Sequence, residues 1–373
     1  IYLSFLEAQM GFGNKLLNGK IRHKIGLKII DKLKINSLSI KDIDKELYIP
    51  VKYDNSDLEM FLCKINNAKV YSSWGFYFTN DNKIIKEVLP YDRILRLSEE
   101  LGGRFAFYNF RFKKKTDLNV FSLQSIWNVC FGHWIHETLP KLFILKDAGF
   151  LDKIDAFILG DGCKTKFHKD SLKIFNLENK KIIYISDQTE IICKNLYLSS
   201  FPSETTHYPS KWICDKYREL TKELMKKYEK NKFPKKIYLS RKNVKTRRIL
   251  NEDKLIKMIK PFEYEIIYPE DYSLEEQFCL FYNADKIISV LGSGLTNLVC
   301  SKETVAVLGI VPNNRMEDTY KAILEKLGGK YYEYIECEET NFKYHNNRNK
   351  NNDFDFYLNI DKFKIIFNEF ENI

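Results

Sequence analysis

The stretch SVLGSGLTNLVC, residues 289–300, places two glycines and the polar residues Ser, Thr and Asn directly after a short apolar run. The apolar run is typical of a buried strand, and the glycines permit a tight turn behind it. Two interpretations are open on this stretch alone. It is either a plain turn from a strand into a helix that opens at residues 295–297, or a backbone cradle for a phosphate group.

The sequence around this stretch repeats one rhythm from Pro234 onward, because short apolar runs alternate with amphipathic segments. This alternation predicts βα units in a parallel, doubly wound sheet, whose ligands bind at the carboxyl ends of strands. Ser273 and Glu276 are expected to form a capping box, and Asn251 to cap another helix. The predicted strands are KKIYLS, EYEIIYP, KIISVL, TVAVLGI and YYEYIEC, and the predicted helices are NEDKLIKMIK, SLEEQFCLFYNA, MEDTYKAILEKLGG and IDKFKIIFNEFEN.

The sequence between about residues 40 and 200 mixes strands and helices and predicts a layered α/β domain. Its strands are expected at AKVYSSW, WGFYFTN, DAFILG, KIIYIS and NLYLSS, and a helix at residues 133–149. A long charged helix between Pro209 and Pro234 is expected to connect two domains. The predicted organisation is a basic segment 1–35, an acceptor and base domain 36–208, a connecting helix 209–233, a nucleotide-sugar-binding domain 234–345, and a polar loop with a closing helix 346–373.

Residues 20–35, KIRHKIGLKIIDKLKI, predict a basic amphipathic helix, because isoleucine and leucine recur every four residues among lysines. Such a helix either docks on an anionic membrane surface or packs on its own domain with a solvated basic face. The chain begins at Ile1 and not at a methionine, so it is interpreted either as a fragment or as carrying a non-native leader ahead of Met10.

Composition limits the classes of protein to which the chain can belong. Its 373 residues predict two domains, and its net charge of +10 suits nucleic acid, an anionic membrane or phosphate-bearing substrates. Nucleic acid ranks last, because no zinc-finger, RNP-like or helix-turn-helix pattern is present. The eight cysteines form no CxxC pair, which favours a reducing, cytoplasmic compartment without disulfides. No apolar run approaches the length of a membrane span.

Two further segments contain residues suited to chemistry. In YLSRKNVKTRRILNEDKL, Arg241 follows a predicted strand and Arg247 and Arg248 follow in a loop, where guanidinium groups would hold a diphosphate unless this is simply a basic surface loop. In NVCFGHWIHETLPKL, His133 and Glu137 are four residues apart on a predicted helix, which suits a general base. The plainer alternative is a helix start whose histidine is satisfied by a neighbour. The order HxxHE differs from the HExxH of zinc proteases, and no metal is expected.

Taken together, these three segments resemble glycosyltransferase family 61, in the order and spacing of an HW-x-x-E helix, an S-R…N-E segment and a turn that ends in GLTN. The resemblance covers about residues 128–309. It implies a GT-B-like α/β fold, with two Rossmann-like domains facing across a cleft. It also implies a nucleotide-sugar donor, often UDP-linked, with inversion at the anomeric carbon and no cofactor or metal.

The resemblance also implies roles for individual residues. Glu137 matches the family's acidic residue and is the expected base, with His133 beside it. Leu291 departs from the family, which usually has a histidine there, so a changed donor or lower activity is expected. The donor-binding residues implied by the match are Arg241, Arg247, Arg248, Glu276, Gln277, Gly292, Ser293, Gly294, Thr296 and Asn297.

The sequence therefore predicts an inverting glycosyltransferase that builds a surface polysaccharide such as capsule or lipopolysaccharide, at the cytoplasmic side and peripheral to the membrane. Its expected partners are a nucleotide-sugar donor, a glycan or glycolipid acceptor, and an anionic membrane surface through residues 20–35. Three alternatives stay open: a non-catalytic relative that binds a sugar nucleotide and assists assembly, a membrane-surface scaffold, and a transferase that uses a CMP-sugar.

Overall fold

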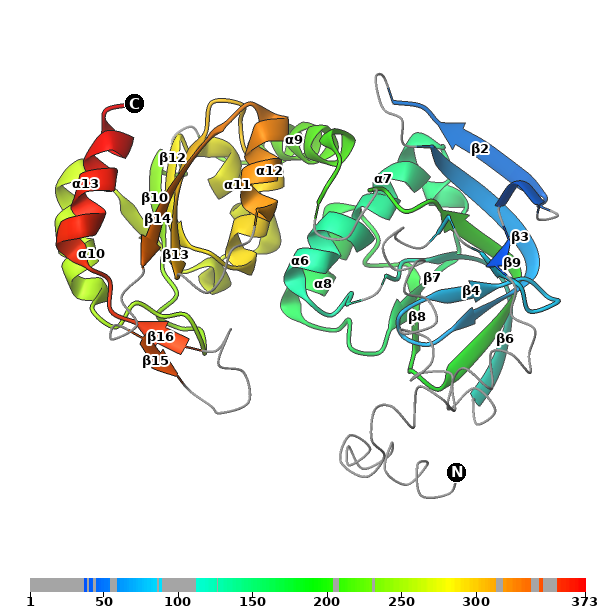
Figure 1. Ribbon diagram of the computed structural model, residues 1–373. Helices are drawn as coiled ribbons and strands as arrows, with labels where there is room; N and C mark the ends of the chain where they lie inside the picture. The colour runs from blue at the N-terminus through cyan, green and yellow to red at the C-terminus, as the bar shows by residue number, and fades with distance from the viewer. Residues whose placement is uncertain are drawn as a thin grey trace. The chain divides into compact units, whose positions relative to one another are not determined.

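The structure of the chain is a computed structural model (Figure 1). It divides into two compact units, Ile1–His207 and Tyr208–Ile373. The basic helix predicted at residues 20–35 lies outside the part of the chain that the structure describes. The described residues are 37–38, 40–42, 45–53, 59–85, 87–88, 112–125, 127–203, 208–229, 232–312, 318–336, 342–344 and 354–373.

The second unit contains the parallel sheet that the βα alternation predicts. Its strand order is β11-β10-β12-β13-β14, and every neighbouring pair is parallel. In chain order this is 2-1-3-4-5, so the direction of winding reverses between β10 and β12. The strands are β10 (Lys236–Leu239), β11 (Glu265–Ile267), β12 (Lys286–Val290), β13 (Ala306–Pro312) and β14 (Lys330–Glu336).

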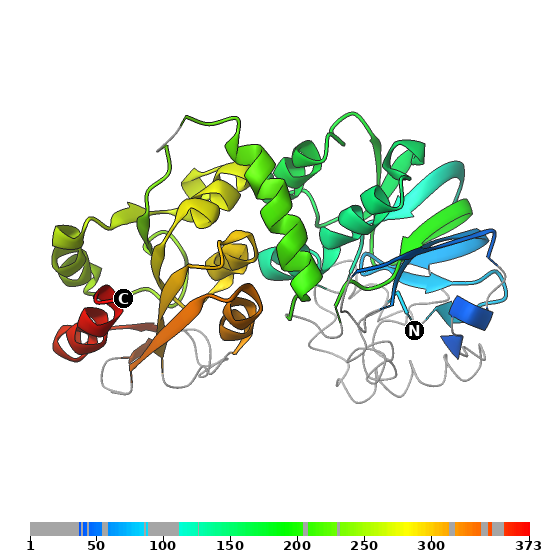
Figure 2. The same ribbon diagram turned by 90° about the horizontal axis from the view of Figure 1, so that it is seen from above.

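Helices cover both faces of this sheet, as expected for strands whose side chains are buried on both sides. Figures 1 and 2 show α10 and α13 on one face and α9, α11 and α12 on the other. The helices are α9 (Lys211–Met225), α10 (Glu252–Ile259), α11 (Leu274–Asn283), α12 (Thr319–Leu327) and α13 (Ile360–Glu371). The 3₁₀ helices are η5 (Lys260–Phe262), η6 (Pro269–Asp271) and η7 (Ser293–Cys300).

The ends of these elements confirm some local predictions and correct others. Ser273 and Glu276 form the predicted capping box of α11. Asn251 precedes α10 but does not cap it, because its side chain bonds instead to both backbone groups of Leu358. The segment predicted at 346–373 as a polar loop and a closing helix also contains a short strand, β16 (Phe354–Phe356). It pairs antiparallel with β15 (Phe342–Tyr344).

The first unit contains a mixed nine-stranded sheet of order β1-β5-β4-β3-β9-β6-β7-β8, with β2 paired to β3. The strands β9, β6, β7 and β8 are parallel neighbours, whereas β2, β3, β4 and β9 pair antiparallel. The two sheets are consistent with two Rossmann-like domains. The strands are β1 (Ser37–Leu38), β2 (Leu47–Val51), β3 (Met60–Tyr71), β4 (Phe76–Phe78), β5 (Ile84–Ile85), β6 (Phe112–Ser122), β7 (Ala156–Gly160), β8 (Lys181–Ile185) and β9 (Thr189–Ser199).

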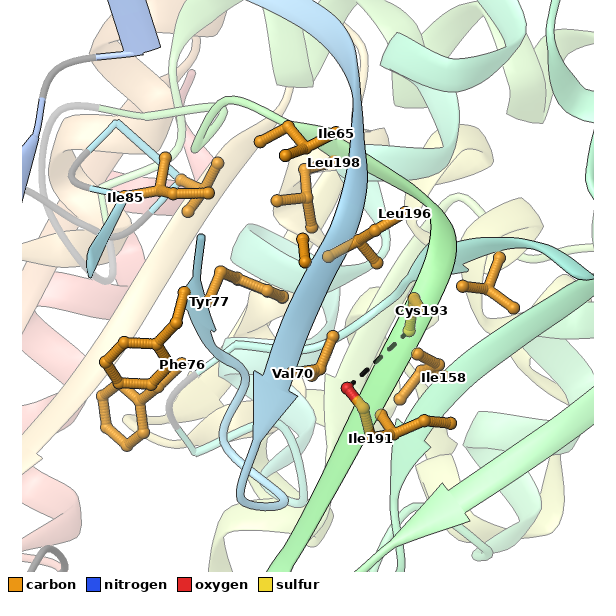
Figure 3. Close-up of a cluster of buried hydrophobic side chains, with 14 of the residues drawn as sticks. Ile65, Val70, Phe76, Tyr77, Ile85, Ile158, Ile191, Cys193, Leu196 and Leu198 are labelled. Atoms are coloured by element: carbon orange, nitrogen blue, oxygen red, sulfur yellow. Dashed lines mark hydrogen bonds between the residues drawn. The ribbon is translucent and has the colours of Figure 1, made fainter. Parts of the chain in front are cut away.

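One face of this sheet forms an apolar core, in which β3 and β9 contribute facing side chains (Figure 3). Ile65 pairs with Leu196, and Ala68 pairs with Cys193. In β3 the residues that face the core are therefore odd-numbered before Asn67 and even-numbered after it. The paired core-facing residues of β9 change from even-numbered to odd-numbered at the same point, and Asn67 has a φ of +54°. If side chains alternated strictly between the two faces along the whole strand, the apolar residues of one half would point away from the core. The break in alternation at Asn67 therefore keeps the apolar residues of both halves of each strand on the core face.

The helical part of the first unit carries the HWIHE motif. A single helix was predicted over residues 133–149, but the structure contains a short α helix, a π-helical turn and a second α helix. Pro140 explains the interruption, because it has no N–H to donate to the carbonyl of His136. Leu139 instead donates to Trp134, five residues back. The elements are η1 (Ile40–Asp42), α6 (Phe131–His133), the π turn η3 (Trp134–Thr138), α7 (Pro140–Asp147), η4 (Leu151–Lys153) and α8 (Lys166–Ile174).

Candidate functional site

The HWIHE motif brings an imidazole and a carboxylate into direct contact in the first unit. Nδ1 of His133 lies 2.7 Å from Oε1 of Glu137, as the four-residue spacing predicted. The Glu137 side chain is 1% exposed and the His133 side chain 10%, so the imidazole is the more accessible partner. A carboxylate at Nδ1 favours the tautomer with the proton on that nitrogen, which leaves Nε2 as a proton acceptor.

Glu137 lies in the π turn η3, whose five residues are all buried, and His133 directly precedes that turn. The indole N–H of Trp134 donates to the hydroxyl of Ser171 on α8 at 3.0 Å. The hydroxyls of Thr138 and Ser125 lie 2.7 Å apart. π turns are rare and frequently lie at functional sites, since the extra residue redirects side chains.

Lys141, one residue after Pro140, is a buried cation that sequence reasoning missed. Its side chain is 2% exposed, and Nζ donates to the backbone carbonyl of Gln124. Burial lowers the pKa of Lys141 to about 7, although the negative charge of nearby Glu137 opposes the shift. A single lysine inside the apolar run LPKLFIL, four residues after Glu137, was the available signal.

We expect the charge of Lys141 to destabilise the fold most strongly at or below neutral pH. Below pH 7 the amine is charged in both states, so the folded protein bears the whole desolvation penalty. Between pH 7 and about 10.4 only the unfolded chain binds the proton, and the free energy of unfolding rises with pH. The stability of Lys141→Met relative to wild type should therefore be higher at pH 6 than at pH 9 by about 2 to 3 kcal/mol in urea unfolding. An equal difference at both pH values would contradict the assignment.

In the second unit, the winding reversal places two loops side by side at the carboxyl ends of β10 and β12. Because these strands are parallel neighbours, Arg241 and Gly292 follow them at the same edge of the sheet. A Cβ atom built on Gly292 would overlap Nη1 of Arg241, and would lie 3.1 Å from its Cζ. The guanidinium of Arg241 therefore packs on the bare backbone of the glycine turn, and the sequence placed both residues correctly at one edge.

Arg247 lies on the same glycine. Its Nη1 would be 3.6 Å from a Cβ atom on Gly292, and it donates to the carbonyl of Leu291 at 2.9 Å. Arg247 has a φ of +60°, which is uncommon for a residue with a side chain. Nη2 of Arg241 donates to the carbonyl of Thr246 at 3.1 Å. These contacts fix two guanidinium groups beside one turn, an arrangement that suits paired hydrogen bonds to a phosphate.

Arg248, the third predicted arginine, is engaged elsewhere. Its Nε and Nη2 lie 2.9 and 2.6 Å from Oδ2 of Asp355 on β16, and its backbone N–H donates to Oδ1 at 2.8 Å. The Asp355 side chain is fully buried. This ion pair joins the arginine loop to the hairpin of β15 and β16, so Arg248 is placed to hold the loop in position.

Of the two predicted donor-binding residues in α11, Gln277 contacts the glycine turn and Glu276 caps its own helix. Glu276 accepts from the backbone and hydroxyl of Ser273 and from Lys232, which is a capping role. Gln277 donates to the carbonyl of Pro269 at 2.8 Å and accepts from Nδ2 of Asn297 at 3.1 Å. Gln277 therefore ties the helix η7 to the loop that follows β11.

The remaining predicted donor-binding residues, all in the glycine turn, differ in exposure to solvent. Ser293 is exposed and Gly294 half-buried, whereas Thr296 and Asn297 are buried. Leu291, which stands where the resemblance leads one to expect a histidine, is fully buried. Sequence reasoning missed Tyr320, whose hydroxyl donates to the carbonyl of Gly292 at 2.8 Å. Nothing in the sequence of α12 marks that residue.

Two further features of the described residues concern metals and membranes. No group of three or more His, Cys, Asp or Glu side chains there is arranged to hold a metal ion. Within the same residues, no helix combines the length and apolar character needed to cross a bilayer.

These features define an α/β protein with a doubly wound unit whose strand ends present an arginine and glycine site suited to an anion. A comparison with protein families matches residues 131–308 to the family described as Glycosyltransferase 61. Residues 131–308 thus match a glycosyltransferase family 61 domain, a class of domain that transfers a sugar from a donor to an acceptor. The match includes the His133–Glu137 pair and the Arg241–Gly292 site. No curated protein matches the chain.

Proposed function

We propose that the protein is an inverting glycosyltransferase of the GT-B class, which moves a sugar from a nucleotide-sugar donor, UDP-linked, to a glycan or glycolipid acceptor of a surface polysaccharide. The observation that carries the proposal is the packing of Arg241 and Arg247 on Gly292 at the winding reversal. Doubly wound sheets bind their ligands at this point, and two guanidiniums suit a diphosphate. In this proposal the second unit binds the donor, and the first unit supplies the base.

The leaving group determines what the donor site must do. As the bond between the anomeric carbon and the diphosphate breaks, negative charge builds on the phosphate oxygens. Guanidiniums that are already fixed in place stabilise that charge without reorganising during the reaction. Arg241 and Arg247 are held by backbone carbonyls at 3.1 and 2.9 Å, which supplies this preorganisation. The bare backbone of Gly292 leaves room for the guanidinium of Arg241 beside the turn, where that group can meet the phosphate.

The base must take a proton from the attacking acceptor hydroxyl. The resemblance pointed to Glu137 as the base, but its carboxylate is almost fully buried and contacts His133. We therefore propose that the two residues act as one unit. Nε2 of His133 accepts the proton, and Glu137 holds the ring by Nδ1 and stabilises the imidazolium that forms.

A second candidate function is a non-catalytic relative that binds a sugar nucleotide. The observation that favours it is Leu291, whose side chain is fully buried where the resemblance leads one to expect a histidine. Its backbone carbonyl still accepts from Arg247, so the anion site is intact in this reading. Nucleotide binding without turnover would support this alternative.

The first test is a thermal-shift titration of the whole chain with UDP, GDP, CMP and ADP, each with and without EDTA. A ligand that binds only the folded state raises the Tm by mass action, by a few °C at about 100 times its Kd. We expect one nucleotide, UDP, to give a shift that EDTA does not remove and that Arg241→Ala abolishes. A shift with CMP alone would assign the CMP-sugar class instead, and no shift with any nucleotide would overturn the proposal.

A further inference from the structure

The inference concerns two tryptophans beside the His133–Glu137 pair. Trp74 lies in the turn after β3, and Trp127 lies in the turn that precedes α6. Their ring centroids are 4.8 Å apart at an angle of 46°. The ring of Trp127 is 6.5 Å from the ring of His133. An aromatic surface thus lies directly beside the more accessible member of the pair.

Trp127 differs from the buried tryptophans of the chain in exposure and in backbone conformation. Its side chain is 40% exposed, whereas Trp134 and Trp212 are buried in cores. A single exposed apolar side chain is ordinary on a protein surface. A bulky residue at a φ of +64° is not, because that conformation is strained for a side chain of this size. Strain retained beside a proton-accepting pair points to function rather than to packing.

Buried hydrogen bonds hold the turn of Trp74 and the turn of Trp127 in fixed positions relative to each other. The side-chain amide of Asn128, which follows Trp127, donates to the carbonyl of Ser73 at 3.0 Å. The carbonyl of Asn128 accepts from Nε2 of His168 at 3.0 Å, and burial lowers the pKa of that histidine to about 4, so it stays neutral. Gln124 donates to the carbonyl of Ser72 at 3.1 Å. Because these groups are buried, moving either turn would leave polar atoms unsatisfied.

We propose that Trp127, supported by Trp74, is the platform on which a pyranose ring of the acceptor glycan stacks. The C–H face of a sugar ring is apolar and packs on an indole, while its hydroxyls stay free for hydrogen bonds. A ring on Trp127 would have hydroxyls near His133, where the proposed proton transfer takes place. The inference rests on the proposed function and adds that the acceptor is a glycan, recognised by a sugar ring.

The test measures glycan capture by the labelled full-length chain on an array of oligosaccharides, with Trp127→Ala, Trp127→Phe and the control Phe112→Ala. Phe112 is 58% exposed and is the first residue of β6 in the same unit, outside the two turns that carry Trp74 and Trp127. We expect capture by wild type, a loss of about tenfold or more in Trp127→Ala, substantial retention in Trp127→Phe, and full retention in Phe112→Ala.

Tryptophan fluorescence gives a second readout for any captured oligosaccharide. Trp134 and Trp212 are buried, so a sugar should perturb emission from Trp74 and Trp127 only. The perturbation should shrink in Trp127→Phe, even if Trp127→Ala folds poorly. Equal capture by Trp127→Ala and wild type, or no capture by wild type, overturns the platform. The nucleotide thermal shift is measured in parallel, because a platform that fails while the shift persists leaves the proposed function standing.

Discussion

Replacing Glu137 by Gln, or His133 by Asn, is expected to reduce turnover by about 10²- to 10⁴-fold, the usual contribution of a positioned general base. The 2.7 Å contact between the two side chains makes them one unit, so the double variant should lose little more than either single variant. Turnover is followed as release of nucleotide from the sugar nucleotide that stabilises the protein. The Tm shift with nucleotide should be unchanged, since neither residue belongs to the second unit.

The two single variants separate the roles of the pair. If Nε2 of His133 takes the proton, His133→Asn should lose more turnover than Glu137→Gln. Glu137→Gln should retain part of its turnover, because the imidazole remains. Lys146→Gln is a matched control, since it removes an exposed charge from the same helical segment, and its turnover should equal that of wild type. Full turnover in Glu137→Gln would refute the proposal that the pair works as a unit.

Replacing Gly292 by Ala is expected to weaken nucleotide-diphosphate binding by about 10- to 100-fold while leaving the fold intact. The added methyl group would overlap the end of a flexible side chain, Arg241, which can swing away. The displaced guanidinium then loses its charge-assisted hydrogen bonds to phosphate, each of which contributes about 1.5 to 3 kcal/mol. Arg241→Ala should give a similar loss. Calorimetric titration with UDP measures both.

Two controls make this prediction specific. A Cβ atom on Gly294 would meet only Pro269, at 4.0 Å, so Gly294→Ala should bind UDP as wild type does. Arg248→Ala should lower the Tm, because the buried carboxylate of Asp355 loses its ion-pair partner. It should not weaken UDP binding, because it leaves the anion site unchanged. If Gly292→Ala and Gly294→Ala bound UDP equally well, the contact between Arg241 and the glycine turn would have no part in recognition.

The fold of the second unit could be predicted from its sequence because local pattern and tertiary structure agree there. Each strand is a short apolar run, each helix has one apolar face, and Ser273 with Glu276 marks a helix start that the structure contains. The fold of the first unit was less accessible. Its antiparallel part depends on pairings such as Leu62 with Ser199, which no local pattern encodes. The break in alternation at Asn67 also disguises the length of β3.

The candidate site divides in the same way. Contacts between near neighbours, such as His133 with Glu137, followed from spacing alone, as did the position of Arg241 at the carboxyl edge. Contacts between distant residues did not. Arg248 was grouped with the phosphate-binding arginines because its partner, Asp355, lies 107 residues away in a segment without clear pattern. The π turn was missed because Pro140 was taken as compatible with one continuous helix.

Helix α13 has a consequence for how the protein is made. Its buried residues Phe363, Phe367 and Phe370 complete the core on one face of the second sheet. Lys236, at the start of β10, forms an ion pair with Glu371 at 2.7 Å, so the first strand of the unit contacts its last helix. During synthesis, one apolar face of the parallel sheet stays incompletely covered until the ribosome has released residues up to Phe370. The first unit, Ile1–His207, is compact by itself and can complete its core while the second unit is still being translated.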